Sequence, residues 1–498
     1  MTTRLDKPAR LILPALLCVA SLAGAGALAQ ATSDDPAQPA AQPATAADMQ
    51  PSFHQLLDAR QYELAAAEGQ RLVDAASRRP EAGEELQIAL MNLAVAQYFS
   101  GDYLGAEASY LRVIELVEAS GRLTTPRLAR AEAGLAATYH AGKRYDLAVE
   151  HFDRAVLLSR RSEGLFNEAQ LPLLQKYADS LTEVGRLEDA LKAQRYSLRV
   201  VERKYGAVSL RYATQLESVA RWFSRIGSYD ASRAALRRAI DIIEAAKGAD
   251  APELIGPLGA LADCNRRQLL DPLQRDLPSA DDQRRSMFHD PMAPLGSSVS
   301  ASAINTEGLK ALERAVAIAS SRSDPSPVQL ADVRTQLGDW FQSQKQFDRA
   351  LPQYQLAWRS AAGQSVDGKP LTERLFGRPV LLHYEPPPSW DRYSGRPPGE
   401  TTVRNAAVEF TVSPQGRVVD PKVVADGGDP KLGSLTEKAA QSARYRPRLD
   451  KGEPVETPGI RLDQPFYVLV EDAPAAEPAG EPAGEPATAP AEAQPPGT

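Results

Sequence analysis

The side chains that most often carry out catalysis are scattered in this sequence of 498 residues. None of its histidines belongs to a His-Glu-x-x-His zinc motif, and no Gly-x-Ser-x-Gly nucleophile motif occurs. The five histidines are His54, His140, His151, His289 and His383. Paired acids such as Glu84-Glu85 and Asp281-Asp282 lie in expected surface turns, which favours solvated charge over acid–base chemistry. The sequence therefore predicts no enzyme, no metal site and no cofactor.

Net charge and cysteine content exclude further classes of protein. The net charge of −7, with no block rich in lysine and arginine, argues against a nucleic-acid-binding protein. Two cysteines cannot build a disulfide framework, and we expect Cys264 to pack as a small apolar side chain. The function that remains is binding of other molecules. Whether charged side chains can act together in binding depends on the helices and strands that position them.

A repeated pattern supplies those elements. It begins in residues 86–119 with Leu93-Ala94, Tyr103, Ala106 and Tyr110, and comparable residues return every 42 positions. Small residues recur where two helices must approach closely, and bulky apolar residues recur one helical turn away. A glycine near the middle of each unit is typical of a turn between helices: Gly101, Gly142, Gly185 and Gly227. Repeats of fixed length indicate a stacked array.

The array is interrupted once. Leu261-Ala262 keep the period, but the second half of that unit is displaced by about 34 residues, to Leu312 and Ala315. The inserted stretch at about 270–302 contains four prolines and cannot be one continuous helix, so it is either disordered or folded back onto the array. A further unit follows at Leu337-Gly338, so that six units share one register, and a weaker seventh precedes them at 53–78.

The series Leu-Ala/Gly, Gly-x-Tyr and Ala-x-x-x-Tyr/Phe-x-x-Ala resembles the tetratricopeptide repeat (TPR) family, in the long-helix form of kinesin light chains. A period of 42 would also suit HEAT or armadillo repeats, but the glycine in mid-unit and the Ala-Tyr/Phe-Ala series fit TPR repeats better. The resemblance implies a mainly α fold, with a TPR α-solenoid of about six to seven helix pairs over 53–362.

In TPR arrays the first helix of each unit lines a groove for protein or peptide partners, and the register carries that role to nine residues here. They are Tyr98, His140, Asp179, Arg221, Arg225, Asp263, Arg266, Arg267 and Asp339. The four arginines, in two adjacent units, would form a cationic patch suited to carboxylate-bearing partners. The alternative is that they pair with Asp179, Asp263 and neighbouring glutamates in a solvated ion network.

The pattern changes after Leu375. Residues 403–412 alternate between apolar and polar side chains, which predicts a half-buried strand, and the run Ser413-Pro414-Gln415-Gly416 predicts a turn. A second strand is expected at 418–424, where Pro421 restricts it to a sheet edge or a bulge. A helix at 431–444 and a closing strand at 460–470 complete a small α+β unit.

This unit resembles the TonB C-terminal domain family over about 379–471. The resemblance rests on VEFTVSPQGRVVDPKVV at 408–424, SARYRPRLDKGEPV at 442–455 and Phe466, whereas residues 425–428 depart from the family's usual Ser-Ser-Gly. It implies a domain that accepts an extended partner segment along a sheet edge. The closing strand is the expected edge, through Ile460, Leu462, Phe466 and Val468. Pairing of this edge within the domain or within a dimer is the alternative.

The remaining segments bear on location. Residues 1–29 combine a positive start, an apolar core and Ala27-Leu28-Ala29, which is typical of a cleaved signal peptide. An uncleaved membrane anchor is the alternative, because residues 11–29 carry no charge. A lipoprotein signal at Cys18 is disfavoured by Leu17, which stands where a small residue is usual. Residues 30–52 form an expected Ala/Pro-rich linker, and residues 472–498 an expected disordered tail.

These features predict a periplasmic protein–protein interaction scaffold of a Gram-negative bacterium, without catalysis. Expected partners are proteins or peptides, outer-membrane TonB-dependent receptors or other envelope proteins among them, and no nucleic acid. The membrane would be contacted only through an uncleaved N-terminal segment. The alternative is a TonB-type energy transducer for outer-membrane transport, anchored in the inner membrane by that segment; the functional histidine of the TonB membrane helix has no counterpart in residues 11–29.

Overall fold

The computed structural model describes residues 53–79, 81, 83–271, 300–322, 324–387, 390 and 401–470. The expected signal peptide, the linker, most of the insertion and the tail lie outside these residues. The chain divides into two compact units. One comprises Met1–Gln268 and Pro278–Ala311, and the other Leu269–Leu277 and Leu312–Thr498.

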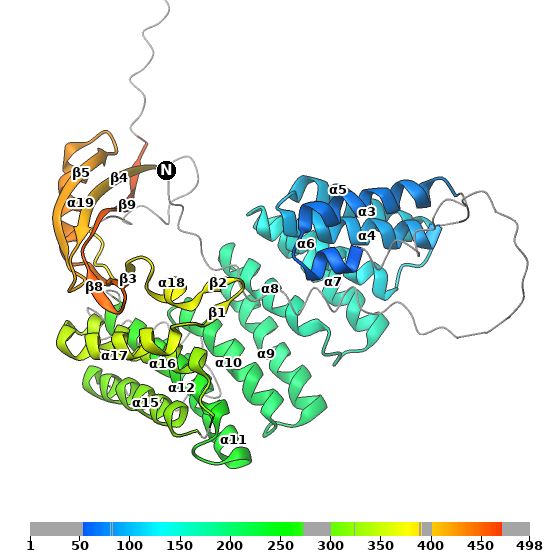
Figure 1. Cartoon of the computed structure of the whole chain (residues 1–498). Coiled ribbons are helices and arrows are strands. Elements are labelled where there is room, and N and C mark those ends of the chain that lie inside the picture. The colour runs from blue at the N-terminus through cyan, green and yellow to red at the C-terminus, as the bar shows by residue number, and fades with distance from the viewer. Residues whose placement is uncertain are drawn as a thin grey trace, which may run out of the picture. The chain divides into compact units, whose positions relative to one another are not determined.

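The first unit is a series of helices in which, from α3 to α11, each packs against the next (Figure 1). A short helical stretch at 53–58 precedes α3 (Tyr62–Ser77). Four pairs follow: α4 (Gly83–Ser100) with α5 (Tyr103–Ala119), α6 (Pro126–Ala141) with α7 (Tyr145–Glu163), α8 (Gln170–Glu183) with α9 (Leu187–Tyr205), and α10 (Leu210–Arg225) with α11 (Tyr229–Lys247). A 3-10 turn, η1 (Pro252–Leu254), leads into α12 (Ile255–Leu270), and α15 (Ala301–Ser321) continues into the second unit.

Capping residues and a proline define where several of these helices begin. Thr125 accepts a hydrogen bond from the Leu128 N–H and Ser209 from the Tyr212 N–H, each at 3.2 Å, which satisfies an N–H group that has no partner within its helix. Pro126 occupies the first turn of α6, where its missing N–H costs nothing. The second helices of the four pairs begin 42 residues apart, at Tyr103, Tyr145, Leu187 and Tyr229. The predicted register is confirmed.

Small residues allow the paired helices to approach closely. Ala94, Ala136, Ala178 and Ala220, one in each first helix, are all 0% exposed. Bulky side chains of the second helices fill the adjacent core, where Tyr110 and Phe152 are each 1% exposed. Neighbouring pairs fit together in the same way, because a Cβ atom added to Gly134 of α6 would overlap the Tyr110 ring of α5 and no larger residue fits there without movement. The predicted helix-pair repeat therefore has its expected physical basis.

The turns within the pairs each contain a residue with positive φ. It is a glycine in three of them, Gly101 (87°), Gly185 (77°) and Gly227 (77°). In the α6–α7 turn it is Lys143 (61°), which stands 42 residues after Gly101. Gly142 lies in that turn as expected, but its φ of −76° is open to any residue.

The second unit contains the last helix pair, α16 (Pro327–Ser343) and α17 (Phe347–Ala361). The strands β1 (Ser365–Val366) and β2 (Lys369–Pro370) and the helix α18 (Leu371–Phe376) follow it. Leu371 is 0% exposed and packs with Ala331 and Ala361. The segment thus covers apolar surface that a further repeat would otherwise bury.

A three-stranded antiparallel sheet in the order β5-β4-β9 follows in the same unit (Figure 1). Its strands are β4 (Thr401–Val412), β5 (Val418–Asp426) and β9 (Thr457–Leu469), and α19 (Pro430–Ala440) packs against it. Val408, Phe410 and Ala440 form part of the core between helix and sheet. Two short pairs complete the domain: β3 (Val380–His383) with β6 (Arg444–Arg446), and β7 (Arg448–Asp450) with β8 (Glu453–Val455).

The strand predictions hold better than the helix prediction in this domain. The helix expected at 431–444 ends at Ala440, because residues 444–446 pair with β3 as β6. The prediction that Pro421 lies at an edge or a bulge is confirmed on both counts. β5 is an edge strand, and its register with β4 shifts between Glu409 and Thr411, opposite Pro421.

Buried polar contacts join the last helix pair to the sheet domain. Gln342 of α16 donates hydrogen bonds to the carbonyl oxygens of Gln415, at 2.8 Å, and Tyr445, at 2.9 Å. Arg446 Nε lies 3.3 Å from Asp339 Oδ1. Since a buried polar group without a partner costs about 1–3 kcal/mol, these contacts couple the stability of α16 to that of the domain.

Replacement of Gly185 by alanine should destabilise the array by about 1–2 kcal/mol, because alanine is strained at a φ of 77°. No atom lies within 4 Å of the added Cβ, so backbone strain is the only expected cost. Gly142→Ala is the matched control, since its φ is −76° and its Cβ would lie 3.5 Å from the nearest heavy atom. Denaturation followed by circular dichroism compares the two; equal losses would contradict the assignment.

Candidate functional site

Side chains from three first helices meet in one polar cluster. This first-helix cluster consists of His140 of α6, Lys176, Asp179 and Ser180 of α8, and Arg225 of α10. His140 Nδ1 lies 2.8 Å from Ser180 Oγ, and Arg225 donates to Asp179 Oδ1 at 2.5 Å. The structure thus brings together three of the residues that the sequence placed in a groove, and adds Lys176, which sequence reasoning missed.

Burial gives this cluster an unusual charge balance. It lowers the pKa of His140 to about 4, an effect that the positive charge of Lys176 increases, so the imidazole is neutral at pH 7. Burial also lowers the pKa of Lys176, an effect that Asp179 opposes. In the described part of the chain, the Lys176 ammonium has no hydrogen-bond or ion-pair partner. Two cationic side chains therefore face one carboxylate, which leaves capacity for an anionic partner group.

Three of the four arginines expected to form a cationic patch are in internal ion pairs. Arg225 pairs with Asp179, and Arg266 and Arg267 each bond Asp263 of the same helix at 2.7 Å. Arg221 is exposed and has no ion-pair partner among the described residues. Ion pairing within the array, the alternative raised from the sequence, thus describes three of the arginines, and Arg221 is the exception.

The other two predicted groove residues are engaged in packing. The Tyr98 ring lies 5.2 Å from that of Phe99, and burial raises the pKa of Tyr98 to about 12. Asp339 accepts a hydrogen bond from the Tyr354 hydroxyl at 3.0 Å and pairs with Arg446. The register places both residues in first helices, where tertiary contacts occupy their polar groups.

Glu217 of α10 is a further candidate that sequence reasoning missed. Burial raises the pKa of Glu217 to about 7, although Arg221, one turn later, lowers it. No motif marks this residue, because its burial comes from neighbouring elements. A Cβ on Gly256 of α12 would lie 3.8 Å from Glu217 Oε2. The carboxyl group therefore changes charge near neutral pH.

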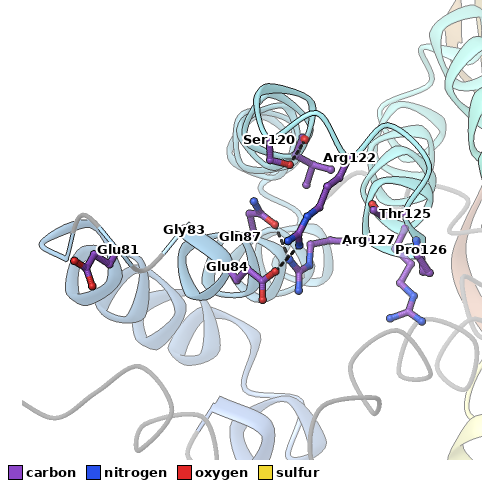
Figure 2. Close-up of a pocket in the computed structure, with 11 residues that line it drawn as sticks. Glu81, Gly83, Glu84, Gln87, Ser120, Arg122, Thr125, Pro126 and Arg127 are labelled. Atoms are coloured by element: carbon purple, nitrogen blue, oxygen red, sulfur yellow. Dashed lines mark hydrogen bonds and ion pairs between the residues drawn. The ribbon is translucent and has the colours of Figure 1, made fainter.

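A hollow of about 570 Å³ lies elsewhere in the first unit, at the start of α4, the end of α5 and the start of α6 (Figure 2). Figure 2 shows Arg122 reaching Glu84 and Arg127 reaching Gln87, at 2.7 Å and 2.6 Å. Arg122 and Arg127 therefore already have hydrogen-bond partners within the wall of the hollow. Glu84 is 65% exposed, as expected of a solvated acid, but it lies in the first turn of α4 and not in the surface turn expected from the sequence.

The outer edge of β9 is the candidate surface of the sheet domain. β9 pairs with β4 in unbroken register over residues 460–469. The Tyr467 N–H points away from β4 and donates to the Trp390 carbonyl at 3.0 Å. Backbone groups alternate in direction along an antiparallel strand, so every second residue faces outward. These residues are Arg461, Asp463, Pro465 and Tyr467. Within the described residues, no strand pairs with this edge.

The β9 residues that the sequence singled out lie in the strand, but they face the core and β4. Phe466 is 3% exposed, and Ile460 and Leu462 pack against the core cluster of the domain. Val468 shares their side of the strand and is half-buried. The alternate residues Arg461 and Asp463, joined by an ion pair of 2.9 Å, form the open edge.

The described residues contain no group of three or more histidine, cysteine, aspartate or glutamate side chains that could hold a metal ion. None of the helices described is long and apolar enough to cross a membrane. Cys264 is 1% exposed, and burial raises the pKa of its thiol to about 11. Its expected role as a packed apolar side chain is confirmed.

Fold and site define a helix-pair repeat protein that ends in a small α+β domain, as the sequence predicted. Residues 405–463 match the family model described as Gram-negative bacterial TonB protein C-terminal, which confirms the resemblance in that region. A search of the curated proteins finds no match to this sequence.

Several solved structures are similar to the helical part. The TPR-like repeats of a putative kinesin light chain from Podosopora anserina are 14% identical, with a TM-score of 0.38, and the match covers 41% of this chain and 97% of that one. BtubC (BKLC) from P. vanneervenii is 16% identical, with a TM-score of 0.35 and coverage of 61% and 94%. The TPR2AB domain of yeast Sti1, in complex with pHSP90, is 14% identical, with a TM-score of 0.23 and coverage of 64% and 91%. Similarity at this level carries no information about partners.

The raised pKa of Glu217 should make the stability of the array depend on pH. The folded chain keeps the Glu217 proton up to about pH 7, whereas the unfolded chain releases it near pH 4.5. The folded state binds more protons in this window, so its stability falls as pH rises. Glu217→Gln should remove that loss, and its advantage over the wild type in free energy of unfolding should grow from pH 4.5 to 7 and then level off. Denaturation across the window measures this.

Glu183→Gln, at an exposed position of α8, is the matched control. A gain of the same size and pH dependence in this variant would show that the effect is not specific to Glu217. A difference between Glu217→Gln and the wild type that does not change with pH would refute the assigned titration.

Proposed function

We propose that this protein is a scaffold of the Gram-negative cell envelope that holds protein or peptide partners in the periplasm and catalyses no reaction. The helical array offers the first-helix cluster and Arg221 to acidic partner groups. The C-terminal domain offers the outer edge of β9 to an extended segment. The match of residues 405–463 to the TonB C-terminal family supports an envelope location, and the signal-like residues 1–29 support export.

The open edge of β9 is the observation that carries this proposal. A strand edge with free N–H and C=O groups is a template for another strand. Pro465 has no N–H to offer, and Trp390 already bonds Tyr467, so the C-terminal part of the edge is closed. The accessible part is therefore short and lies around Arg461 and Asp463, which fits a partner segment of a few residues in extended conformation.

Replacement of Asp463 by proline should abolish capture of the extended segment. The Asp463 N–H points outward and makes no bond to β4, so its loss removes a donor to the partner while the sheet keeps its own hydrogen bonds. Asp463→Ala keeps the N–H and is the matched control. A photo-crosslinking side chain at Arg461, in cells of the source organism, reports capture. Equal crosslinking yields in the two Asp463 variants would rule out strand addition at this edge.

Charge reversal of Arg221 tests the helical surface. Arg221→Glu should weaken binding of an acidic partner peptide roughly tenfold or more, because a cation within reach of a partner carboxylate becomes an anion. Stability should change only through Glu217, whose charged form Arg221 favours, since Arg221 has no ion-pair partner among the described residues. Arg225→Glu should also weaken binding but additionally destabilise the array through Asp179. Unchanged affinity of Arg221→Glu in calorimetric titration would remove this surface from the proposal.

The second candidate function is that of a TonB-type energy transducer, which the family match at 405–463 favours. It requires residues 1–29 to be kept as a membrane anchor. N-terminal sequencing of the protein from the envelope separates the two functions, because the scaffold would begin at Gln30.

A further inference from the structure

Four apolar side chains protrude where α7 and α9 end. Leu165 is 60% exposed, Phe166 39%, Tyr205 40% and Val208 71%. Leu165 and Phe166 lie in the connection after α7, Tyr205 is the last residue of α9, and Val208 lies in the turn before α10. Large apolar side chains that are exposed together often mark an interaction site, whereas single exposed ones are common on any surface.

Glu168 ties the two connections into one surface. Its carboxylate accepts hydrogen bonds from Lys204 at 2.9 Å and from Tyr205 at 2.6 Å, and it also pairs with Arg211. The hydrogen bond from Tyr205, with those from the two basic side chains, lowers the pKa of Glu168 to about 2. We call residues 160–168 and 199–211 the α7–α9 tip.

A second contact reinforces the link between the connections. The Arg203 guanidinium lies 5.8 Å from the centre of the Phe166 ring. A basic side chain at the end of α9 therefore stands beside an exposed aromatic ring of the other connection. The apolar and basic groups of the tip share one surface.

The α7–α9 tip is basic although the chain is acidic. It contains six basic and three acidic residues, a net charge of +3, whereas the whole chain carries −7. Arg161, Arg199 and Arg203 are exposed and have no ion-pair partner among the described residues. The segments that carry the protruding apolar side chains thus have a net positive charge, with Arg203 beside the Phe166 ring, and anionic lipid surfaces attract this combination.

We infer that the α7–α9 tip binds an anionic phospholipid surface. Leu165 and Val208 enter the boundary of the acyl chains, the rings of Phe166 and Tyr205 lie at headgroup level, and the free arginines meet lipid phosphates. The apolar groups stand out from two connections instead of lining a hollow, so a fluid surface that reshapes around them suits them better than a folded partner. This contact is independent of the two protein-binding surfaces proposed above.

Sedimentation with lipid vesicles tests this inference. The full chain and the chain from Gln30 are mixed with vesicles of phosphatidylglycerol and phosphatidylethanolamine, or of phosphatidylcholine alone. Both forms should bind the anionic vesicles, about tenfold or more tightly than the neutral ones, and added salt should weaken the binding. Binding by the full chain alone would assign the contact to residues 1–29 and overturn the inference.

Matched variants locate the contact. Leu165→Ser combined with Phe166→Ser should weaken binding to anionic vesicles roughly tenfold or more, whereas Leu104→Ser, at a leucine 77% exposed at the start of α5, should not. Arg161→Glu combined with Arg203→Glu should have a similar effect, and Arg78→Glu combined with Arg238→Glu should have none. Thermal melting checks that each variant is folded. Binding that survives both tip variants, or no binding to anionic vesicles, would overturn the inference.

Discussion

Close contact between helices at small side chains is the constraint on which this structure depends. Each first helix, from Ala94 to Gly338, carries an alanine or glycine at the same register position, and the alanines among them are at most 1% exposed. A Cβ on Gly338 would overlap the Tyr354 ring, so the available volume at such positions is already full. Because each unit packs chiefly on its neighbours, this local fit propagates along the array and sets the spacing at which charged side chains of successive first helices meet.

That spacing brings charged side chains of three first helices together in the first-helix cluster. His140, Asp179 and Arg225 come from three helices that follow one another at intervals of about 40 residues in sequence, yet the structure joins them in one cluster. Burial then changes the charge states, with His140 neutral and the pKa of Lys176 lowered. Where charges of one helix can satisfy each other, as Asp263 does with two arginines, the same type of residue serves stability and not binding.

In the C-terminal domain, the proposed binding surface consists of backbone groups at a strand edge and not of charged side chains. Pro421 and a bulge interrupt the β5 edge of its sheet, and Pro465 interrupts the β9 edge. Prolines and bulges at sheet edges limit uncontrolled strand pairing. The residues that match the TonB C-terminal family, 405–463, contain the sheet core. Contacts from Gln342 and Asp339 of α16, which lie outside the matched region, reach Gln415 and Arg446 within it.

The sequence alone determined the helix pairs, their 42-residue register and the strands β4, β5 and β9, since periodic burial and turn residues are local properties that each segment carries by itself. The tertiary structure decided the rest. It made Lys143, and not Gly142, the left-handed residue of its turn, and it ended α19 early in favour of the short strand β6. It also decided which arginines are paired, why the pKa of Glu217 is raised, and which side of β9 faces outward. The reason is physical: ion pairing, desolvation and strand direction depend on distances between segments remote in sequence, and no local pattern records those distances.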